Sequence, residues 1–382
     1  MTGRILLAIL LSMVLVSCGK KNEIEETKTA PVENVVTPEV NVEENGVKDG
    51  IVKELDKDGN LAGELCYKNG KLNGISKVYY KSGELKLEVN YTDGKPEGLT
   101  KGFFKNGTVQ TESGFKDGMK EGPTKSYYDD GKVEVDTNYK AGRKIGVEKI
   151  YWMNGKLKAE INYIEGIPEG PSKFYDKEGI QTGEYILKNG EKEGLSKEYD
   201  KTGKLQTEST YVNGKIEGMV KKYYPSGKLM VESKFVHGVQ EGLEKEYHES
   251  GKVKAENHWA NWKMEGPAQR FHENGKLQME NNWKDGKEDG VEKVYFESGN
   301  LRSQSTWVED KLEGLVKDFY DNGKPREEAY YKNGKREGKT KRYYESGQLS
   351  ADCDYKDGNL VKEDVFPEKN PKKEAAPAVK KK

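Results

Sequence analysis

Glycine recurs every 24 residues over most of this chain, and this period is the strongest constraint on its fold. One series of glycines covers positions 50–338 and another covers positions 59–347, both without an insertion. A third series begins at Gly70 and is broken where Trp262 and Asp310 replace glycine. An unbroken period of this length predicts a repeat array in which each unit packs against its two neighbours.

The segments between the glycines predict strands. They are seven to ten residues long and carry aromatic residues at fixed places, which is typical of β-strands and too short for helices. Asn-Gly, Asp-Gly and Ser-Gly dipeptides fall where tight hairpin turns need a positive φ. The apolar spacing of three and four that helix pairs require is absent. We therefore expect an all-β fold, an elongated single-layer antiparallel sheet of tandem 24-residue hairpins, about 120 Å long at about 10 Å per hairpin.

One repeat gives an expected register. If Ser82-Gly83 is a two-residue loop, Tyr80 lies opposite Leu85, and Lys77 lies opposite Glu88. The lysine and the acid recur in nearly every unit, so opposite charges should face each other across the hairpins. The apolar face would then carry Tyr80, Leu85, Leu87, Val89 and Tyr91, and the other face Lys77, Tyr79 and Glu88.

The composition agrees with a sheet that has one charged face. Lysine and arginine number 65 against 66 aspartate and glutamate, while hydrophobic residues make up 33% of the chain. The balanced charge gives no bulk attraction to nucleic acid, and the small apolar fraction argues against a thick globular enzyme. The three cysteines at positions 18, 66 and 353 are too few and too scattered for a disulfide framework or a thiolate metal site.

The repeated unit resembles the MORN repeat, in the bacterial variant found in repeat-rich secreted proteins and in proteins described as antitoxins. The resemblance rests on units of the type YTDGKPEG at residues 91–98 and YKNGKREG at residues 331–338, and it covers about residues 46–362. It implies an elongated, twisted antiparallel sheet of successive hairpins that serves as a binding or assembly surface. It does not imply chemistry.

The N-terminus has the pattern of a signal peptide. Arg4 precedes an apolar run at residues 5–16, which is too short to span a bilayer. The segment at residues 15–18, Leu-Val-Ser-Cys, resembles the lipobox of bacterial lipoproteins, which implies cleavage before Cys18 and a lipid such as palmitate on that cysteine. Gly19 after the cysteine favours, by family analogy, the outer membrane or cell surface. An ordinary cleaved signal with an incidental cysteine is the alternative.

These patterns divide the chain into four parts. We expect a lipoprotein signal peptide at 1–17, a flexible tether at 18–48, an array of about 13 MORN-type repeats at 49–362 and a disordered Lys-rich tail at 363–382. The tether has no aromatic residue after the cysteine and cannot bury enough apolar surface to fold.

Departures from the consensus are concentrated between residues 237 and 307, where all four histidines and four of the five tryptophans lie. Trp259, Trp283 and Trp307 take the consensus tyrosine position in three consecutive units, and Trp262 takes a turn glycine position. These residues are candidates for an aromatic platform that binds a protein or a glycan. The alternative is that the tryptophans replace tyrosine in a packed stripe.

His248 and His272 share one repeat position, so we include them in the candidate binding site. Their spacing raises zinc binding as an alternative, but no third ligand is apparent. We therefore expect no metal site and no cofactor. Phosphate-binding, nucleophile-elbow and zinc-protease motifs are absent from the sequence.

The sequence therefore predicts a lipid-anchored, non-catalytic surface scaffold that binds a macromolecule, with host-cell interaction or adhesion as one role. The membrane contact would be the lipid on Cys18, and the protein or glycan partner is not identified by the sequence. The alternative is an antitoxin or immunity-like protein that neutralises a toxic partner. A hydrolase acting at the histidine and tryptophan cluster is a third, less favoured hypothesis.

Overall fold

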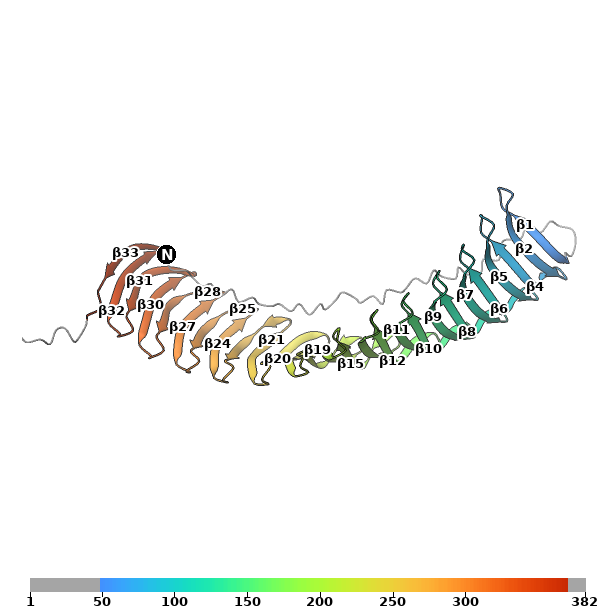
Figure 1. Cartoon of the computed structure of the whole chain (residues 1–382). Helices are drawn as coiled ribbons and strands as arrows, with labels where there is room; N and C mark the ends of the chain where they lie inside the picture. Colours follow the sequence, from blue (N-terminus) through green and yellow to red (C-terminus); the bar gives the residue numbers. More distant parts are fainter. Residues whose placement is uncertain (1–48, 370–382) are drawn as a thin grey trace, which may run out of the picture. The chain divides into compact units, whose positions relative to one another are not determined.

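The computed structural model describes residues 49–369, and within them the backbone forms strands, turns and loops without a helix. The strands make one antiparallel sheet of 33 segments, in which hairpin follows hairpin along the chain (Figure 1). This confirms the expected all-β sheet of tandem hairpins. No helix in this part of the chain is long and apolar enough to cross a membrane. The signal peptide, the tether at 18–48 and residues 370–382 of the tail lie outside the described residues.

The strand bounds follow the 24-residue period. Six two-residue segments are separated by one residue from the strand that follows them. In chain order the strands are β1 (Gly50–Leu55), β2 (Leu61–Lys68), β3 (Lys71–Leu72), β4 (Gly74–Tyr79), β5 (Leu85–Thr92), β6 (Lys95–Phe103), β7 (Val109–Lys116), β8 (Met119–Tyr127), β9 (Val133–Lys140), β10 (Arg143–Tyr151), β11 (Leu157–Ile164), β12 (Ile167–Tyr175), β13 (Gln181–Lys188), β14 (Glu191–Lys192), β15 (Gly194–Tyr199), β16 (Leu205–Val212), β17 (Lys215–Ile216), β18 (Gly218–Tyr223), β19 (Leu229–Val236), β20 (Val239–Tyr247), β21 (Val253–Ala260), β22 (Lys263–Met264), β23 (Gly266–Phe271), β24 (Leu277–Lys284), β25 (Lys287–Glu288), β26 (Gly290–Tyr295), β27 (Leu301–Val308), β28 (Lys311–Leu312), β29 (Gly314–Phe319), β30 (Pro325–Lys332), β31 (Lys335–Tyr343), β32 (Leu349–Lys356) and β33 (Asn359–Val365).

Two kinds of turn alternate along the array. Asp93 and Gly94 form a two-residue turn in which both φ angles are positive, at 50° and 82°, as the Asp-Gly dipeptide predicts. The loop that contains Gly83 is longer. Gly83 N–H donates to the carbonyl of Tyr80 at 2.8 Å, and Tyr80 N–H donates to the carbonyl of Glu84 at 2.8 Å. Three residues therefore form this loop, with Gly83 at a φ of 96°.

The longer loop corrects part of the expected register. The extra loop residue shifts the pairing, so Tyr79 and not Tyr80 lies opposite Leu85. The two-residue loop predicted at Ser82-Gly83 is wrong, because the glycine ends a three-residue turn and leaves a bulge beside it. Beyond the bulge the prediction is correct, since Lys77 lies opposite Glu88.

The glycine series that includes Gly98 marks a bend within a strand. Gly98 has a φ of 78° and lies in the middle of β6. Val89 and Tyr91 are two residues apart on β5, yet they pair with Thr100 and Pro96, which are four residues apart on β6. The two extra residues form a bulge that bends the strand, and the left-handed backbone there favours glycine. The other two series mark the loops and the two-residue turns.

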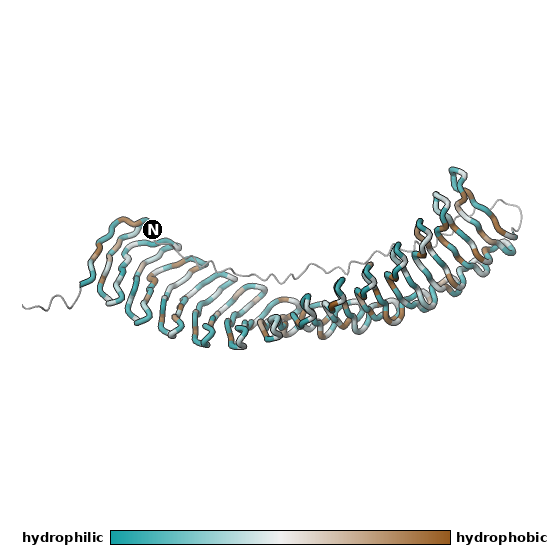
Figure 2. The backbone as a smooth tube through the Cα atoms, in the orientation of Figure 1, coloured by the Kyte–Doolittle hydropathy of each residue, from teal (hydrophilic) through white to brown (hydrophobic). Residues whose placement is uncertain are grey.

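The two faces of the sheet differ in burial. Leu87, Val89 and Tyr91 alternate along β5 on one face, named here the packed face, while Lys77 and Glu88 lie on the other, named the charged face. Hydrophobic residues occur in short stretches along the whole array (Figure 2). A cluster of buried residues is formed by Ala159, Ile161 and Leu187. The buried hydrophobic residues of the described chain all take packed-face positions: Leu65, Val89, Tyr91, Val135, Ala159, Ile161, Leu187, Val220, Phe235, Ala255, Ala268, Ala329, Ala351 and Cys353.

Ion pairs and tyrosine hydrogen bonds join the repeats on the charged face. Lys101 Nζ lies 3.1 Å from Glu112 Oε1, and the Tyr127 hydroxyl of the next repeat donates to Glu112 Oε2 at 2.9 Å. Burial and this hydrogen bond raise the pKa of Tyr127 to about 12. The predicted pairing within a hairpin gives the ion pairs Lys53–Glu64, Lys125–Asp136, Lys149–Glu160 and Lys245–Glu256. Two further pairs, Lys197–Glu184 and Lys293–Glu280, join neighbouring hairpins.

The acid that precedes the bend glycine joins the two-residue turns. Glu97 Oε2 accepts the N–H of Asp117 at 2.8 Å, and Gly118 N–H donates to the carbonyl of Pro96 at 3.0 Å. These bonds connect the turn of one repeat to the strand of the preceding repeat. The same acid-to-turn bond recurs in Glu121–Ala141, Glu169–Asn189, Glu193–Asn213, Glu217–His237, Glu265–Asp285, Glu313–Asn333 and Glu337–Asp357.

Candidate functional site

The two histidines of the candidate site, His248 and His272, each form a hydrogen bond to the next repeat. At the equivalent position of other repeats, the Tyr128 hydroxyl donates to the carbonyl of Tyr151, in the next repeat, at 2.6 Å. His248 Nε2 lies 3.1 Å from the carbonyl of Phe271, and His272 Nε2 lies 3.1 Å from the carbonyl of Tyr295. Because a carbonyl only accepts, Nε2 carries the proton and the imidazole replaces the tyrosine hydroxyl as the donor.

Metal ligation is not indicated around these histidines. His248 Nδ1 lies 2.8 Å from Glu273 Oε2, so its second nitrogen also has a partner within the array. Within residues 49–369, no group of three or more His, Cys, Asp or Glu side chains is arranged to hold a metal ion.

Trp262 lies at the turn edge, on the two-residue turn after β21. It has a φ of 66°, in the left-handed region that glycine occupies in most repeats, and a non-glycine residue there costs about 1 kcal/mol. Its side chain is 40% exposed, and its ring packs edge-on against Phe235 with 5.5 Å between centroids. The favoured turn residue, glycine, is thus replaced here by a partly exposed tryptophan.

Trp259, Trp283 and Trp307 take one position of the packed face in β21, β24 and β27, and all three are half-buried. Each indole N–H reaches a polar side chain on the same face. Trp259 Nε1 donates to Glu244 Oε1, Trp283 Nε1 to Asn281 Oδ1 and Trp307 Nε1 to Glu292 Oε1, each at 3.3 Å. The three consecutive repeats therefore combine tryptophan with carboxylates and an amide.

Three carboxylates lie among these tryptophans without a basic partner. Glu244 Oε2 accepts from Ser233 Oγ and Gln240 Nε2, both at 2.7 Å. Glu292 Oε1 accepts from Ser305 Oγ at 3.0 Å. We name Glu244, Trp259, Trp283, Glu288, Glu292 and Trp307 the acidic tryptophan patch.

The third carboxylate of the patch is electrostatically unfavourable. Asn281, which is 5% exposed, donates its amide to Glu288. Burial raises the pKa of Glu288, and the nearby carboxylates of Glu292 and Asp310 raise it further. Within the described residues, none of the three patch carboxylates forms an ion pair with a lysine or an arginine.

The repeat position of Glu288 carries lysine earlier in the array, at Lys120, Lys144 and Lys192. Lys120 Nζ lies 4.9 Å from the ring centroid of Tyr139, Lys144 Nζ lies 4.9 Å from that of Tyr163, and Lys192 Nζ lies 3.6 Å from that of Tyr185. Burial lowers the pKa of Lys120 and of Lys192. We name Lys120, Tyr139, Lys144, Tyr163, Tyr185 and Lys192 the lysine–tyrosine patch.

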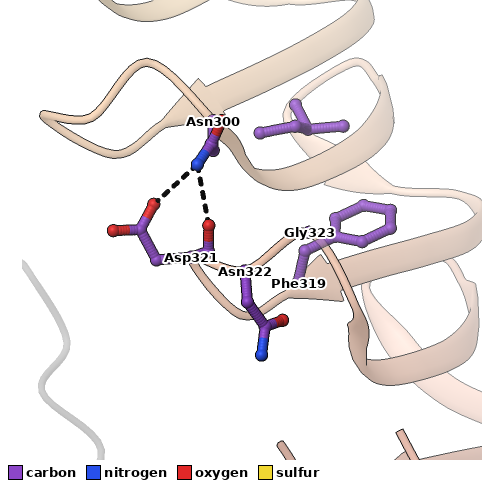
Figure 3. A pocket seen from close by; sticks show the side chains of 6 residues that line it. Asn300, Phe319, Asp321, Asn322 and Gly323 are labelled. Carbon is purple, nitrogen blue, oxygen red and sulfur yellow. Dashed lines mark hydrogen bonds between the residues drawn. The ribbon is translucent and has the colours of Figure 1, made fainter.

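Two small, open hollows lie on the described surface. One of about 330 Å³ lies at the loop edge, where Asn300 Nδ2 donates to the carbonyl of Asp321 at 2.7 Å and to its Oδ1 at 3.2 Å (Figure 3). Phe319 and Gly323 also line it. Another of about 270 Å³ includes Asn281. Both are small for a site that would enclose a drug-sized ligand.

The cysteines do not add a site. Cys66 and Cys353 are free thiols on β2 and β32, and Cys353 is fully buried. Cys18, the predicted lipidation site, lies outside the described residues.

Comparison with known proteins identifies the repeat. A family model described as MORN repeat variant matches eleven segments: 48–69, 72–93, 120–141, 144–165, 192–213, 216–237, 240–261, 264–285, 288–309, 312–333 and 336–357. The skipped intervals 96–117 and 168–189 form strand pairs of the same kind, β6–β7 and β12–β13. No curated protein matches the chain.

Among solved structures, the chain is similar to a crystal structure of TcdB2-TccC3-TEV, with 12% identity over 80% of this chain and 17% of that chain, at a TM-score of 0.13. TcdB2-TccC3 without its hypervariable C-terminal region gives 11% identity over 82% and 19%, at 0.15. A Photorhabdus luminescens Tc holotoxin pore with a TccC3 mutation gives 13% over 78% and 17%, at 0.16. The chain thus spans less than a fifth of the length of these structures.

Proposed function

Because the chain belongs to the MORN repeat variant family, whose repeats suggest a binding scaffold, we propose that it is a non-catalytic macromolecule-binding protein, anchored to the cell envelope by a lipid on Cys18. The acidic tryptophan patch is the proposed contact surface. One observation carries this assignment: Trp259, Trp283 and Trp307 are only half-buried and lie beside carboxylates that no basic side chain of the described array neutralises.

The scaffold does not require these residues. At the tryptophan position other repeats use Tyr91, Tyr139 or Leu187, and at the glutamate position they use Ser172 or Ser196. Partly buried carboxylates without a cation are unfavourable for folding. Tryptophan is enriched among the residues that carry the binding energy of interfaces. A binding role accounts for both features, whereas a packed stripe accounts only for the rings.

The shape of the surface favours a macromolecular partner. The hollows of about 330 and 270 Å³ lie at or below the lower limit of small-molecule pockets. A row of three indoles in consecutive repeats extends over about 20 Å at two strand spacings per repeat. A surface of that length suits a polypeptide or a glycan chain.

The patch is tested by capture of partners from host-cell and cell-envelope extracts. A triple variant with Trp259→Tyr, Trp283→Tyr and Trp307→Tyr restores the consensus residue, so the fold is expected to persist while captured partner falls by about tenfold. Trp152→Tyr is the matched control, because Trp152 lies outside the patch: its Nε1 donates to the carbonyl of Tyr175, and its ring lies under Lys158 and Lys177. Equal capture by the triple variant and the wild type would reject the patch.

The proposed anchor places the protein at the outer membrane or cell surface, where it could serve in host-cell interaction or adhesion. Labelling with palmitate should mark the wild type and leave Cys18→Ala unlabelled. Equal labelling would remove the lipoprotein premise without affecting the patch. A captured partner that is a toxin, with its gene adjacent, would favour the antitoxin alternative.

A further inference from the structure

The repeats of this chain can be compared with one another position by position. Six periods of 24 residues separate Lys144, Glu148 and Tyr163 from Glu288, Glu292 and Trp307. In the first group an ammonium is bound by the chain itself. Lys144 Nζ lies 2.5 Å from Glu148 Oε1 and 4.9 Å from the ring centroid of Tyr163. This group therefore shows where a cation sits on the packed face.

The second group keeps the carboxylate and the aromatic ring but has no cation. Glu292 is oriented by Ser305 Oγ at 3.0 Å and by the Trp307 indole at 3.3 Å. The lysine is replaced by Glu288, which is held by the amide of Asn281. A carboxylate thus takes the repeat position of Lys144, close to the carboxylate of Glu292, which in turn accepts from the Trp307 indole.

We propose that Glu288, Glu292 and Trp307 form a binding site for an alkylammonium group, supplied by a lysine side chain of the partner polypeptide. This inference deepens the proposed function and rests on it, because it names the chemistry that the acidic tryptophan patch recognises. The lysine replaces Lys144 of the first group: its ammonium pairs with the two carboxylates and lies against the indole. Tryptophan gives the strongest cation–π attraction of the aromatic side chains.

A third copy of the group shows why the site is assigned at Glu288 rather than elsewhere. Glu244 and Trp259 are equivalent to Glu292 and Trp307, but there Gln240 Nε2 donates to Glu244 at 2.7 Å. The glutamine amide takes the place of the ammonium as donor to the carboxylate. Glu288 cannot do so when ionised, because a carboxylate only accepts hydrogen bonds. Of the three groups compared, with Lys144, Gln240 and Glu288 at this repeat position, the group of Glu288 is the one without a hydrogen-bond donor there.

The test uses the full chain and a fluorescein-labelled Gly-Ser peptide that carries three lysines, with binding followed by fluorescence anisotropy. The same peptide with Nε-acetylated lysines keeps the backbone and removes the charge. We expect the lysine peptide to bind and the acetylated peptide to bind at least about tenfold more weakly. Equal binding of the two peptides would overturn the proposal.

Glu288→Lys restores the arrangement of Lys144, so the site is filled from within, and peptide affinity should fall by about tenfold or more. Glu297→Lys is the matched control: it makes the same charge change in an exposed loop of the same repeat. Glu292→Gln is nearly isosteric and should also weaken binding. It provides a second test of the site if Glu288→Lys perturbs folding. A similar loss in Glu297→Lys and Glu288→Lys would reduce the effect to general electrostatics and reject the site.

The outcomes separate this inference from the proposed function. Partner capture that is lost in the triple tryptophan variant but retained in Glu288→Lys and Glu292→Gln would reject the ammonium site and support the patch. Peptide binding that depends on Glu288 and Glu292, with partner capture unchanged in the triple variant, would support an ammonium site there but reject the partner as the source of the lysine, together with the patch as its contact surface.

Discussion

The lysine–tyrosine patch and the acidic tryptophan patch lie on the same face of the sheet, but only in the first does a carboxylate of that face have a basic partner, Lys144. Glu148 is 4% exposed and is paired with Lys144. Glu288 and Glu292 are half-buried, and no basic residue of the described array pairs with them. The comparison distinguishes a carboxylate that has a basic partner within the array from carboxylates that have none.

The backbone does not cause this difference. β10 and β11 pair in the same register as β26 and β27, with Gly146 opposite Tyr163 and Gly290 opposite Trp307. The bend and loop glycines and the acid-to-turn bonds occur in both regions, whereas the turn glycine is replaced in the second region by Trp262 and Asp310. The turns and bends of a repeat array therefore do not determine which side chains occupy the packed face. Packed-face charges without a partner in the array are the best candidates for a functional site.

The largest expected effect involves the charged face, which both regions share. The pKa of Tyr127, Tyr199, Tyr247 and Tyr295 is raised to about 12 by burial and by the hydrogen bond to a glutamate. The folded state holds these protons more tightly than the unfolded chain, whose tyrosines ionise near 10.0. The stability that these tyrosines contribute is fully present below pH 10 and is lost as the pH rises from 10 to 12.

Thermal unfolding followed by circular dichroism, together with tyrosinate absorbance, measures this loss. Both regions should unfold over the same alkaline range, because the tyrosine bonds occur in both. Tyrosine ionisation near pH 10 without a fall in the melting temperature would contradict the assigned role of these hydroxyls.

A single substitution should then separate the two regions. Lys144→Ala leaves the carboxylate of Glu148 buried and unpaired, so we expect a loss of about 2 kcal/mol in the stability of the surrounding repeats, between the values for exposed and for buried pairs. Glu288→Ala removes a charge that has no basic partner and should cost little. Hydrogen exchange of amides in β10–β11 and β26–β27 compares the two variants. Equal losses would remove the distinction between the patches.

The histidine position gives a smaller effect. His272→Ala removes the donor to the carbonyl of Tyr295 and should cost about 1 kcal/mol, whereas His272→Tyr restores the residue used in other repeats. Thermal melting of both variants, with partner capture as a second readout, tests this role. A loss of capture in His272→Tyr without a change in melting would place the histidine in the binding site.

The smallest expected effect concerns the charge of the acidic patch. Burial raises the pKa of Glu288 above its ordinary value of 4.5, so the folded chain favours the protonated form. Protonated Glu288 does not destabilise the fold below pH 4.5, and its destabilising effect grows as the pH rises and the carboxylate ionises. Glu288→Gln should therefore be more stable than the wild type at pH 7, by about 1 kcal/mol or less, and equal to it near pH 4. A destabilised glutamine variant at pH 7 would show that the charge is compensated.

Much of the fold follows from the sequence because the repeat constrains it twice, through glycine and through charge. The 24-residue series predicted the hairpins, and the spacing of Lys77 and Glu88 predicted their pairing. The error at Tyr80 arose because Ser-Gly suits both two-residue and three-residue loops, and only the hydrogen bonds of Tyr80 distinguish them. The bend at Gly98 was missed for a related reason: the residues alone do not distinguish a bulge glycine from a turn glycine.

The candidate site was predicted in part. The tryptophans and histidines stood out by composition, but the carboxylates did not, because glutamate is abundant throughout the chain. Glu148, Glu244 and Glu292 share one repeat position, so an alignment of the repeats on their 24-residue period would have found them. The same alignment shows lysine, glutamine and glutamic acid in turn at 144, 240 and 288.

The sequence by itself determined the period, the strand content, the turns with Asp-Gly or Asn-Gly and the neutralised ladder on the charged face, since each depends on residues close in the chain or at fixed spacing. The tertiary structure decided which side chains of the packed face lie beside each other. The bulge at each bend glycine adds two residues to one strand of a pair, which keeps each side chain on its face but changes the residues that it lies opposite on the neighbouring strand. The proximity of Lys144 to Tyr163, and by analogy the ammonium site at Glu288, emerges only when that bend is known.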